Sequence, residues 1–426
     1  MSSLAVMTDR APAAHLLRRL TFGPTEAEVD AAARETPDAT LDRLLAPAPV
    51  PAPPDIGPDP FGALAKGTSR AERQKARQAV RPQVAAVTTW WLSRMVAGGG
   101  AAEKLTFFWH GHWATSVQKV RSATLMLAQQ QTFRRYGTHD TAPLVRAMLR
   151  DPALIIWLDG QRNTRRAPNE NLARELMELF TLGVGHYTED DVKAGAKVLT
   201  GWTVDRAAGT ASLTERRHDQ TPVPLLGAAG IDDVDAYADL LVRHPAHLPF
   251  VTGRLWLRYG STDRPAPAFG GPRDVTAMLR ALAVSEEFAA ARGHLVKQPV
   301  EWLVGALRQL GIDPAKLEDK GRNQLLGMLR ALGQVPFRPP SVGGWPAGRA
   351  WLTTSSAQAR LKAGQQLAML APAAVDRLQG SDRLDVLARM QVVDAWTDRT
   401  RKALVNVKEP RRLLALALAT PEYTVH

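Results

Sequence analysis

The stretch "APNENLARELMELFTLG", residues 167–183, carries the strongest structural signal in this chain. Its apolar spacing predicts one helix, with Pro168 in the first turn and Gly183 just past the end. At about 100° per residue, its polar side chains share about 140° of arc, and apolar side chains fill the rest. These polar side chains are Glu170, Asn171, Arg174, Glu175 and Glu178.

Three carboxylates around one arginine have two interpretations. On an exposed face, each pair spaced four residues apart contributes only a few tenths of a kcal/mol. In a cleft, loss of water would separate the pKa values of the carboxylates and create an acid/base pair. We expect a buried or cleft-lining site in which Glu170 or Glu175 is the general base or a metal ligand. Arg174 would then orient a carboxylate or bind an anionic substrate.

The rest of the chain is ordinary for a globular protein, because 45% of its 426 residues are hydrophobic and 23% are charged. Helical periodicity predominates, and Thr25 and Thr188 are expected helix caps, the latter in a capping box with Asp191. We therefore predict a mainly α-helical protein with one large domain over residues 1–426. The exceptions are a Pro-rich loop at 46–60, an irregular excursion at 203–235 with a small β-hairpin, and a Gly/Pro/Trp-rich loop at 334–353.

The segment "FFWHGHW", residues 107–113, holds His110 and His112. On a regular helix they would point about 200° apart, whereas an irregular turn at Gly111 would let them converge as metal-binding histidines do. The alternative is that they are core groups among the aromatic side chains. If a divalent metal ion is bound, we expect His110, His112, Glu178 and His218 to be its ligands.

Two further segments hold candidate functional residues. In "RRHD", residues 216–219, His218 beside Asp219 is a general base, a metal ligand or neither, and we include Asp219 among the catalytic candidates. Trp345 and Trp351 are either a stacking platform for sugar rings or anchors that hold a long loop on the core. Anchoring is the favoured interpretation.

The formal net charge is +12, and the chain has no cysteine. Its arginines are scattered through helical patterns without a basic run, so nucleic-acid binding is disfavoured, although binding of another polyanion stays open. No apolar run is long enough to span a membrane. The first residues lack the apolar core of a signal peptide. We expect a protein that is cytoplasmic or exported folded with a partner.

Seven segments taken in order resemble the bacterial family called domain of unknown function 1800, over nearly the whole chain. They are "RRLTFGPT", "FWHGHW", "RAPNENLARELMELFTLGVGHYTEDDV", "LTGW", "RHD", "LVKQPVEWLVGALRQLG" and "FRPPSVGGWPAGRAWLTTSSAQARL". The family pattern usually has asparagine where this chain has Gly111, which puts a role of that position in doubt but not the histidines. The resemblance implies a complex with a domain of unknown function 1501 protein, a family whose members tend to carry twin-arginine export signals.

The resemblance does not assign an activity. From the residues we expect an enzyme that hydrolyses a polymer or glycan-like substrate, by metal-assisted or carboxylate acid/base chemistry. The alternatives are a redox metalloprotein and a non-catalytic export or assembly partner, in which the polar face would fix helix packing or dock a partner.

Overall fold

The computed structural model describes residues 10–65, 67–98 and 100–426. In this part of the chain, 23 α-helices accompany four short strands, which confirms the mainly α-helical prediction. Residues 1–9, where we expect no signal peptide, lie outside the described residues. No described helix is long and apolar enough to cross a membrane. Whether the chain folds as one domain stays a prediction.

The first third of the chain is helical apart from the proline-rich loop. Its helices are α1 (Arg10–Leu20), α2 (Glu26–Ala32), α3 (Pro37–Leu45), α4 (Arg70–Ala97), α5 (Ala102–His112), α6 (Val117–Val120), α7 (Ala123–Tyr136), α8 (Thr141–Leu149) and α9 (Pro152–Trp157). Residues 46–60 form neither helix nor strand, as expected. Helix α4 is the longest of these helices and continues through Pro82.

The middle third contains all four strands. Its elements are η1 (Gly160–Arg162), α10 (Asn171–Glu175), the π-helix η2 (Leu176–Thr181), α11 (Glu189–Val198), β1 (Trp202–Asp205), β2 (Thr210–Leu213), η3 (Glu215–Arg217), β3 (Val223–Leu225), β4 (Ala228–Ile231), α12 (Val234–Arg243), α13 (His247–Tyr259), α14 (Val275–Ala283) and α15 (Glu286–Ala290). Strands β1 and β2 pair antiparallel, as do β3 and β4. The hairpin expected within 203–235 is therefore present, with a second one after it.

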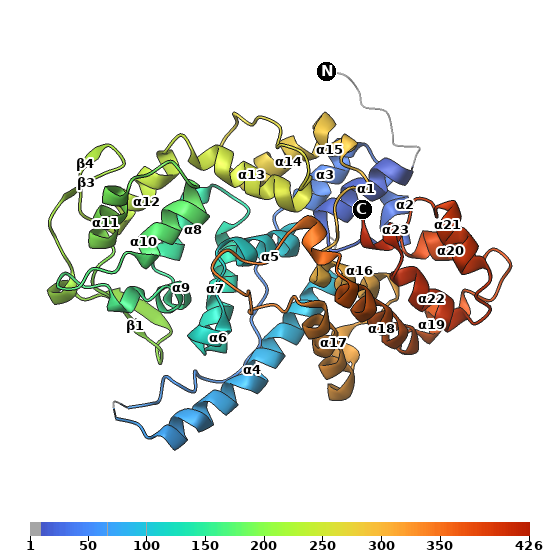
Figure 1. The fold of residues 1–426 in the computed structure, drawn as a ribbon, viewed down its shortest axis with the longest axis horizontal. Coiled ribbons are helices and arrows are strands. Elements are labelled where there is room, and N and C mark those ends of the chain that lie inside the picture. The colour runs from blue at the N-terminus through green and yellow to red at the C-terminus, as the bar shows by residue number, and fades with distance from the viewer. Residues whose placement is uncertain (1–9, 66, 99) are drawn as a thin grey trace.

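The last third is again helical. Its elements are α16 (Pro299–Gln309), η4 (Pro314–Lys316), α17 (Asp319–Leu332), η5 (Gly348–Trp351), α18 (Thr354–Leu370), α19 (Pro372–Asp376), α20 (Arg383–Met390), α21 (Asp398–Val405), α22 (Pro410–Leu418) and α23 (Pro421–Thr424). In Figure 1 these helices gather on the right, α8 to α12 lie on the left, and α5 lies between the two groups.

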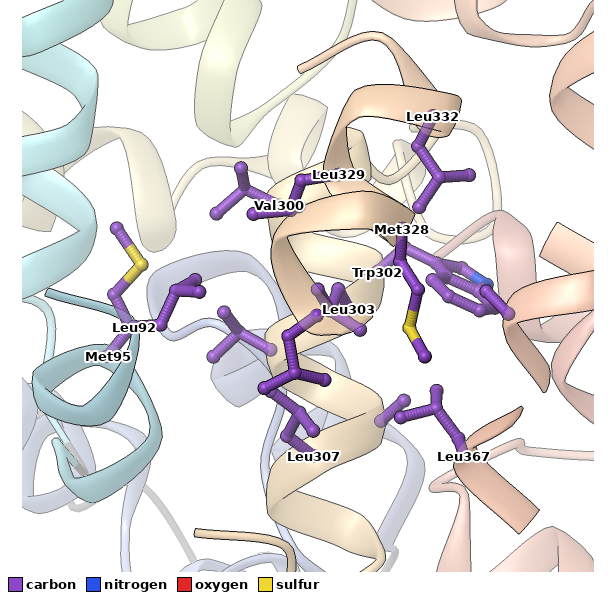
Figure 2. Packing of buried hydrophobic residues seen from close by; sticks show 14 of the residues in the cluster. Leu92, Met95, Val300, Trp302, Leu303, Leu307, Met328, Leu329, Leu332 and Leu367 are labelled. Atoms are coloured by element: carbon purple, nitrogen blue, oxygen red, sulfur yellow. The ribbon is translucent and has the colours of Figure 1, made fainter. Parts of the chain in front are cut away.

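Two large clusters of buried apolar residues stabilise this arrangement, one around α16 and one around α8 to α13. Figure 2 shows the first cluster, where Leu303 of α16 lies between Leu92 of α4 and Met328 of α17, and the ring of Trp302 lies on the far side of Met328. Helix α16 also passes very close to the turn after α1. A Cβ atom on Gly23 would lie only 2.7 Å from the Cα atom of Gly305, so this contact requires glycine. In the same region Arg308 of α16 donates to the Gly23 carbonyl at 3.0 Å, and Glu301 of α16 accepts from Lys104 of α5.

Candidate functional site

The predicted helix over 167–183 is shorter and less regular than its pattern indicates. It begins at Asn171 as α10, so that Pro168 lies outside it, and Gly183 follows its end with a φ of 86° as expected. From Leu176 the backbone is π-helical, and the Thr181 hydroxyl donates to the Leu176 carbonyl at 2.6 Å. Turns of this kind are frequent at functional sites. The wider turn changes the direction of Glu178 relative to a regular helical wheel.

The arginine of the polar face is fully engaged. Arg174 donates through Nη1 to Glu189 Oε1 at 2.6 Å and through Nη2 to Glu170 Oε2 at 3.2 Å. Glu189 begins α11, so these ion pairs tie α10 to the next helix. The three side chains are 33 to 66% exposed, so the pairs contribute little to stability. These ion pairs fix Arg174 in place. Its guanidinium therefore pairs with two carboxylates of the protein, whereas the sequence predicted that it would bind a substrate.

Glu178 and Glu175 have different surroundings on the same half-buried face. Glu178 accepts a 2.7 Å hydrogen bond from the Tyr187 hydroxyl, and burial together with this carboxylate raises the pKa of Tyr187 to about 12. The Glu175 carboxyl group has no hydrogen bond or ion pair to any described residue. Burial and the charge of Glu178 raise its pKa, against the opposing effect of Arg174. Glu175 therefore keeps a proton more readily than a carboxyl group in water.

His110 and His112 do not converge, because α5 stays helical through both of them. His110 Nε2 accepts the backbone N–H of Phe337 at 2.9 Å. His112 Nε2 lies 2.9 Å from the carbonyl oxygen of Phe180. Burial lowers the pKa of both imidazoles to about 3, and the charge of Arg254 adds to the effect at His112, so both are neutral at pH 7.

The end of the π-helix is held by two buried histidines. His112 contacts the Phe180 carbonyl, and His247 Nδ1 lies 3.1 Å from the Thr181 carbonyl. Carbonyl groups at the end of a helix lack partners within the helix, and these imidazoles supply them. His112 therefore joins the "HGH" segment to the predicted helix through its backbone, without facing the carboxylates.

The "RHD" loop stays apart from that helix. His218 Nδ1 lies 3.0 Å from the Thr200 carbonyl, and Asp219 accepts the Thr221 backbone N–H at 3.0 Å. These bonds from Thr221 lower the pKa of Asp219. Within the described residues, no hydrogen bond or ion pair connects His218 or Asp219 with Glu175. Their catalytic role stays a prediction.

The expected metal ligands are not brought together. His110, His112 and His218 each contact a different backbone segment, and Glu178 accepts from Tyr187. In the part of the chain that the structure describes, no group of three or more His, Cys, Asp or Glu residues is arranged to hold a metal ion. The physical reason is the helical spacing of "HGH", which directs its two imidazoles to different sides of α5.

A buried charge cluster is a feature that the sequence reasoning missed. The Glu301 carboxylate accepts from the Lys104 ammonium and from Arg258 Nη1, the latter at 2.9 Å. Lys104 is completely buried and Glu301 is 1% exposed. The sequence feature that could have indicated this cluster is a charged residue within an apolar segment, as in "EKLTFFW" and "PVEWLVGAL". Arg254 and Arg258, four residues apart in "GRLWLRYG", show the same signal.

These features define a mainly helical protein in which buried histidines hold backbone segments and a buried carboxylate joins distant helices. The chain belongs to the family described as protein of unknown function DUF1800, whose model matches residues 15–425. This match confirms the resemblance of the seven segments. No curated protein and no solved structure matches the chain.

Proposed function

We propose that this protein is an enzyme that hydrolyses a polymer or glycan-like substrate by carboxylate acid/base chemistry. The observation that supports the proposal is the half-buried carboxyl group of Glu175, which has no partner among the described residues and a raised pKa. A raised pKa moves the titration of a carboxyl group toward neutral pH, which favours general acid/base catalysis.

Glu178 provides the contrasting carboxylate of the pair. The Tyr187 hydroxyl donates to it at 2.7 Å, whereas the Glu175 carboxyl group lacks such a donor among the described residues. Two neighbouring carboxyl groups with different hydrogen-bond partners can share the roles of acid and base. Glu170, Arg174 and Glu189 would position this pair by tying α10 to α11. The metal-assisted and redox alternatives have no ligand set among the described residues to support them.

Replacing Glu175 by glutamine tests this role. Hydrolysis of a panel of chromogenic glycosides and labelled polysaccharides should fall at least about a hundredfold in Glu175→Gln, because the amide cannot transfer the proton. The melting temperature should stay close to that of the parent, since glutamine keeps the shape of the side chain. The matched control is Glu287→Gln, which removes an exposed carboxylate. The proposal is wrong if Glu175→Gln is as active as the parent, or if the parent hydrolyses no member of the panel.

The non-catalytic assembly partner is a second candidate, favoured by a mostly apolar groove. This groove, of about 1040 Å³, lies among α18, α21, α22 and α23. Its lining includes Leu361, Ala403, Leu404, Leu416 and Val425. An apolar groove of this size is suited to a helix or extended segment of another protein, here the predicted domain of unknown function 1501 partner.

A charge placed in the groove tests this candidate. Ala403 is exposed and lines the groove, so Ala403→Glu should leave folding unchanged and abolish co-purification of the co-expressed partner. Ala71→Glu on the exposed part of α4 is the control. Co-purification that is unchanged in Ala403→Glu would contradict docking in this groove.

A further inference from the structure

A small pocket, which we call the arginine pocket, lies apart from the carboxylate face. It encloses about 240 Å³ where α5, α13 and the loop before η5 meet. Its polar lining comes from His112, Arg254, Arg258, Gln298 and Trp345. None of the described residues that line it carries a carboxylate, so the formal charge of this lining is positive.

Two arginines one helical turn apart dominate its electrostatics. The Arg254 guanidinium has no hydrogen bond or ion pair to any described residue, and burial lowers its pKa. Arg258 is 7% exposed and uses Nη1 for Glu301, while its Nε and Nη2 atoms have no acceptor among the described residues. Nε and Nη2 form the planar edge of a guanidinium that matches the two oxygens of a carboxylate. An unpaired, buried donor edge of this kind is costly unless an anion satisfies it.

His112 adds an acceptor to these donors. Its Nε2 atom faces the Phe180 carbonyl, which can only accept, so Nε2 carries the proton. In a neutral imidazole the other nitrogen is then an acceptor, and Nδ1 of His112 is buried without a partner among the described residues. A hydroxyl group next to an anionic group would satisfy it.

The remaining lining suits a small polar molecule with a carbon face. Gln298 Oε1 accepts from Gln334, so its amide N–H groups are the atoms it can offer to a ligand. Trp345 stacks on Phe107 at 5.6 Å between ring centroids and forms an apolar wall, and its indole N–H is also without a partner among the described residues. Trp345 can therefore serve both as an anchor of its loop and as a surface for a ligand.

We propose that the arginine pocket binds a small hydroxy-carboxylate such as a sugar acid, with Arg254 and Arg258 on the carboxylate and His112 on a neighbouring hydroxyl. A singly charged anion fits better than a dianionic phosphate, because the negative charge of Glu301, which pairs with Arg258 as well as Lys104, offsets part of the positive charge beside the pocket. This proposal does not depend on the hydrolysis proposed for Glu175, because it is tested by ligand binding and not by activity.

Isothermal titration of the full chain with D-glucuronate, D-glucose, acetate and inorganic phosphate tests the proposal. Glucuronate carries both the carboxylate and neighbouring hydroxyls, and we expect it to bind at least about tenfold more tightly than the other three. Arg254→Gln should weaken glucuronate binding at least about tenfold. The matched control is Arg292→Gln, which removes an exposed arginine outside the pocket.

A second variant separates loss of the site from loss of folding. Leu257 lines the pocket and is 38% exposed, so Leu257→Trp should fill the pocket and abolish binding at an unchanged melting temperature. The proposal is overturned if glucuronate fails to bind at up to about 10 mM, or if Arg254→Gln or Leu257→Trp binds it like the parent. Equal or tighter binding of glucose, acetate or phosphate would also overturn it.

Discussion

Replacing Glu301 by glutamine is expected to lower the free energy of unfolding by about 3–5 kcal/mol, the usual cost of removing one partner from a buried ion pair. Glu301 is 1% exposed and holds Lys104 and Arg258 together. Burial by itself would raise the pKa of Glu301, but these two cations lower it to about 2, so the carboxylate is charged. Glutamine would leave both cations without their counter-charge.

Urea denaturation of parent and variant at pH 7 measures this loss. Glu318→Gln, at an exposed carboxylate without an ion pair among the described residues, should change the free energy by no more than about 0.5 kcal/mol. The double variant Lys104→Met with Glu301→Gln should recover part of the loss, because it removes one uncompensated charge. A loss below about 1 kcal/mol for Glu301→Gln would contradict this account.

The second large effect is a loss of stability between about pH 4 and pH 7 that depends on Asp151. This residue is 5% exposed, and burial raises the pKa of its carboxyl group from 3.8 to about 7, against the hydrogen bonds that it accepts. The folded state therefore binds the proton more tightly than the unfolded chain. The stabilisation is complete below pH 3.8 and is lost as the pH rises to 7, with a magnitude on the order of a few kcal/mol.

Asp151→Asn should remove this pH dependence. Asp151 Oδ1 accepts both the Leu154 backbone N–H and Gln129 Nε2 at 2.7 Å, and the amide oxygen of asparagine can accept the same bonds. Denaturant titrations at pH 4 and pH 8 should show a smaller difference for Asp151→Asn than for the parent. Asp233→Asn, at an exposed helix cap, should behave like the parent. Equal pH dependence of parent and Asp151→Asn would exclude Asp151 as the cause.

Local features were predictable because they depend on neighbours in the chain. Helical periodicity identified the fold class, and the caps at Thr25 and Thr188 form as predicted because each contacts a residue three positions later. Gly183 ends its helix because its positive φ suits glycine. The start of that helix was misplaced at Pro168, and nothing in its spacing distinguishes a π-helix from an α-helix.

The sequence by itself determined the helical class, the region that holds the hairpins, the proline-rich loop, the family, and the residue types available for chemistry. Only the tertiary structure decided which of these residues contact one another. Lys104 and Glu301 are 197 positions apart, and His110 bonds to a residue 227 positions away. Such partners depend on how whole helices pack, which local spacing does not encode. For the same reason the Glu175 carboxyl group has no partner among the described residues while Arg174 forms ion pairs, and Arg254 and Arg258 line a pocket that no sequence motif indicated.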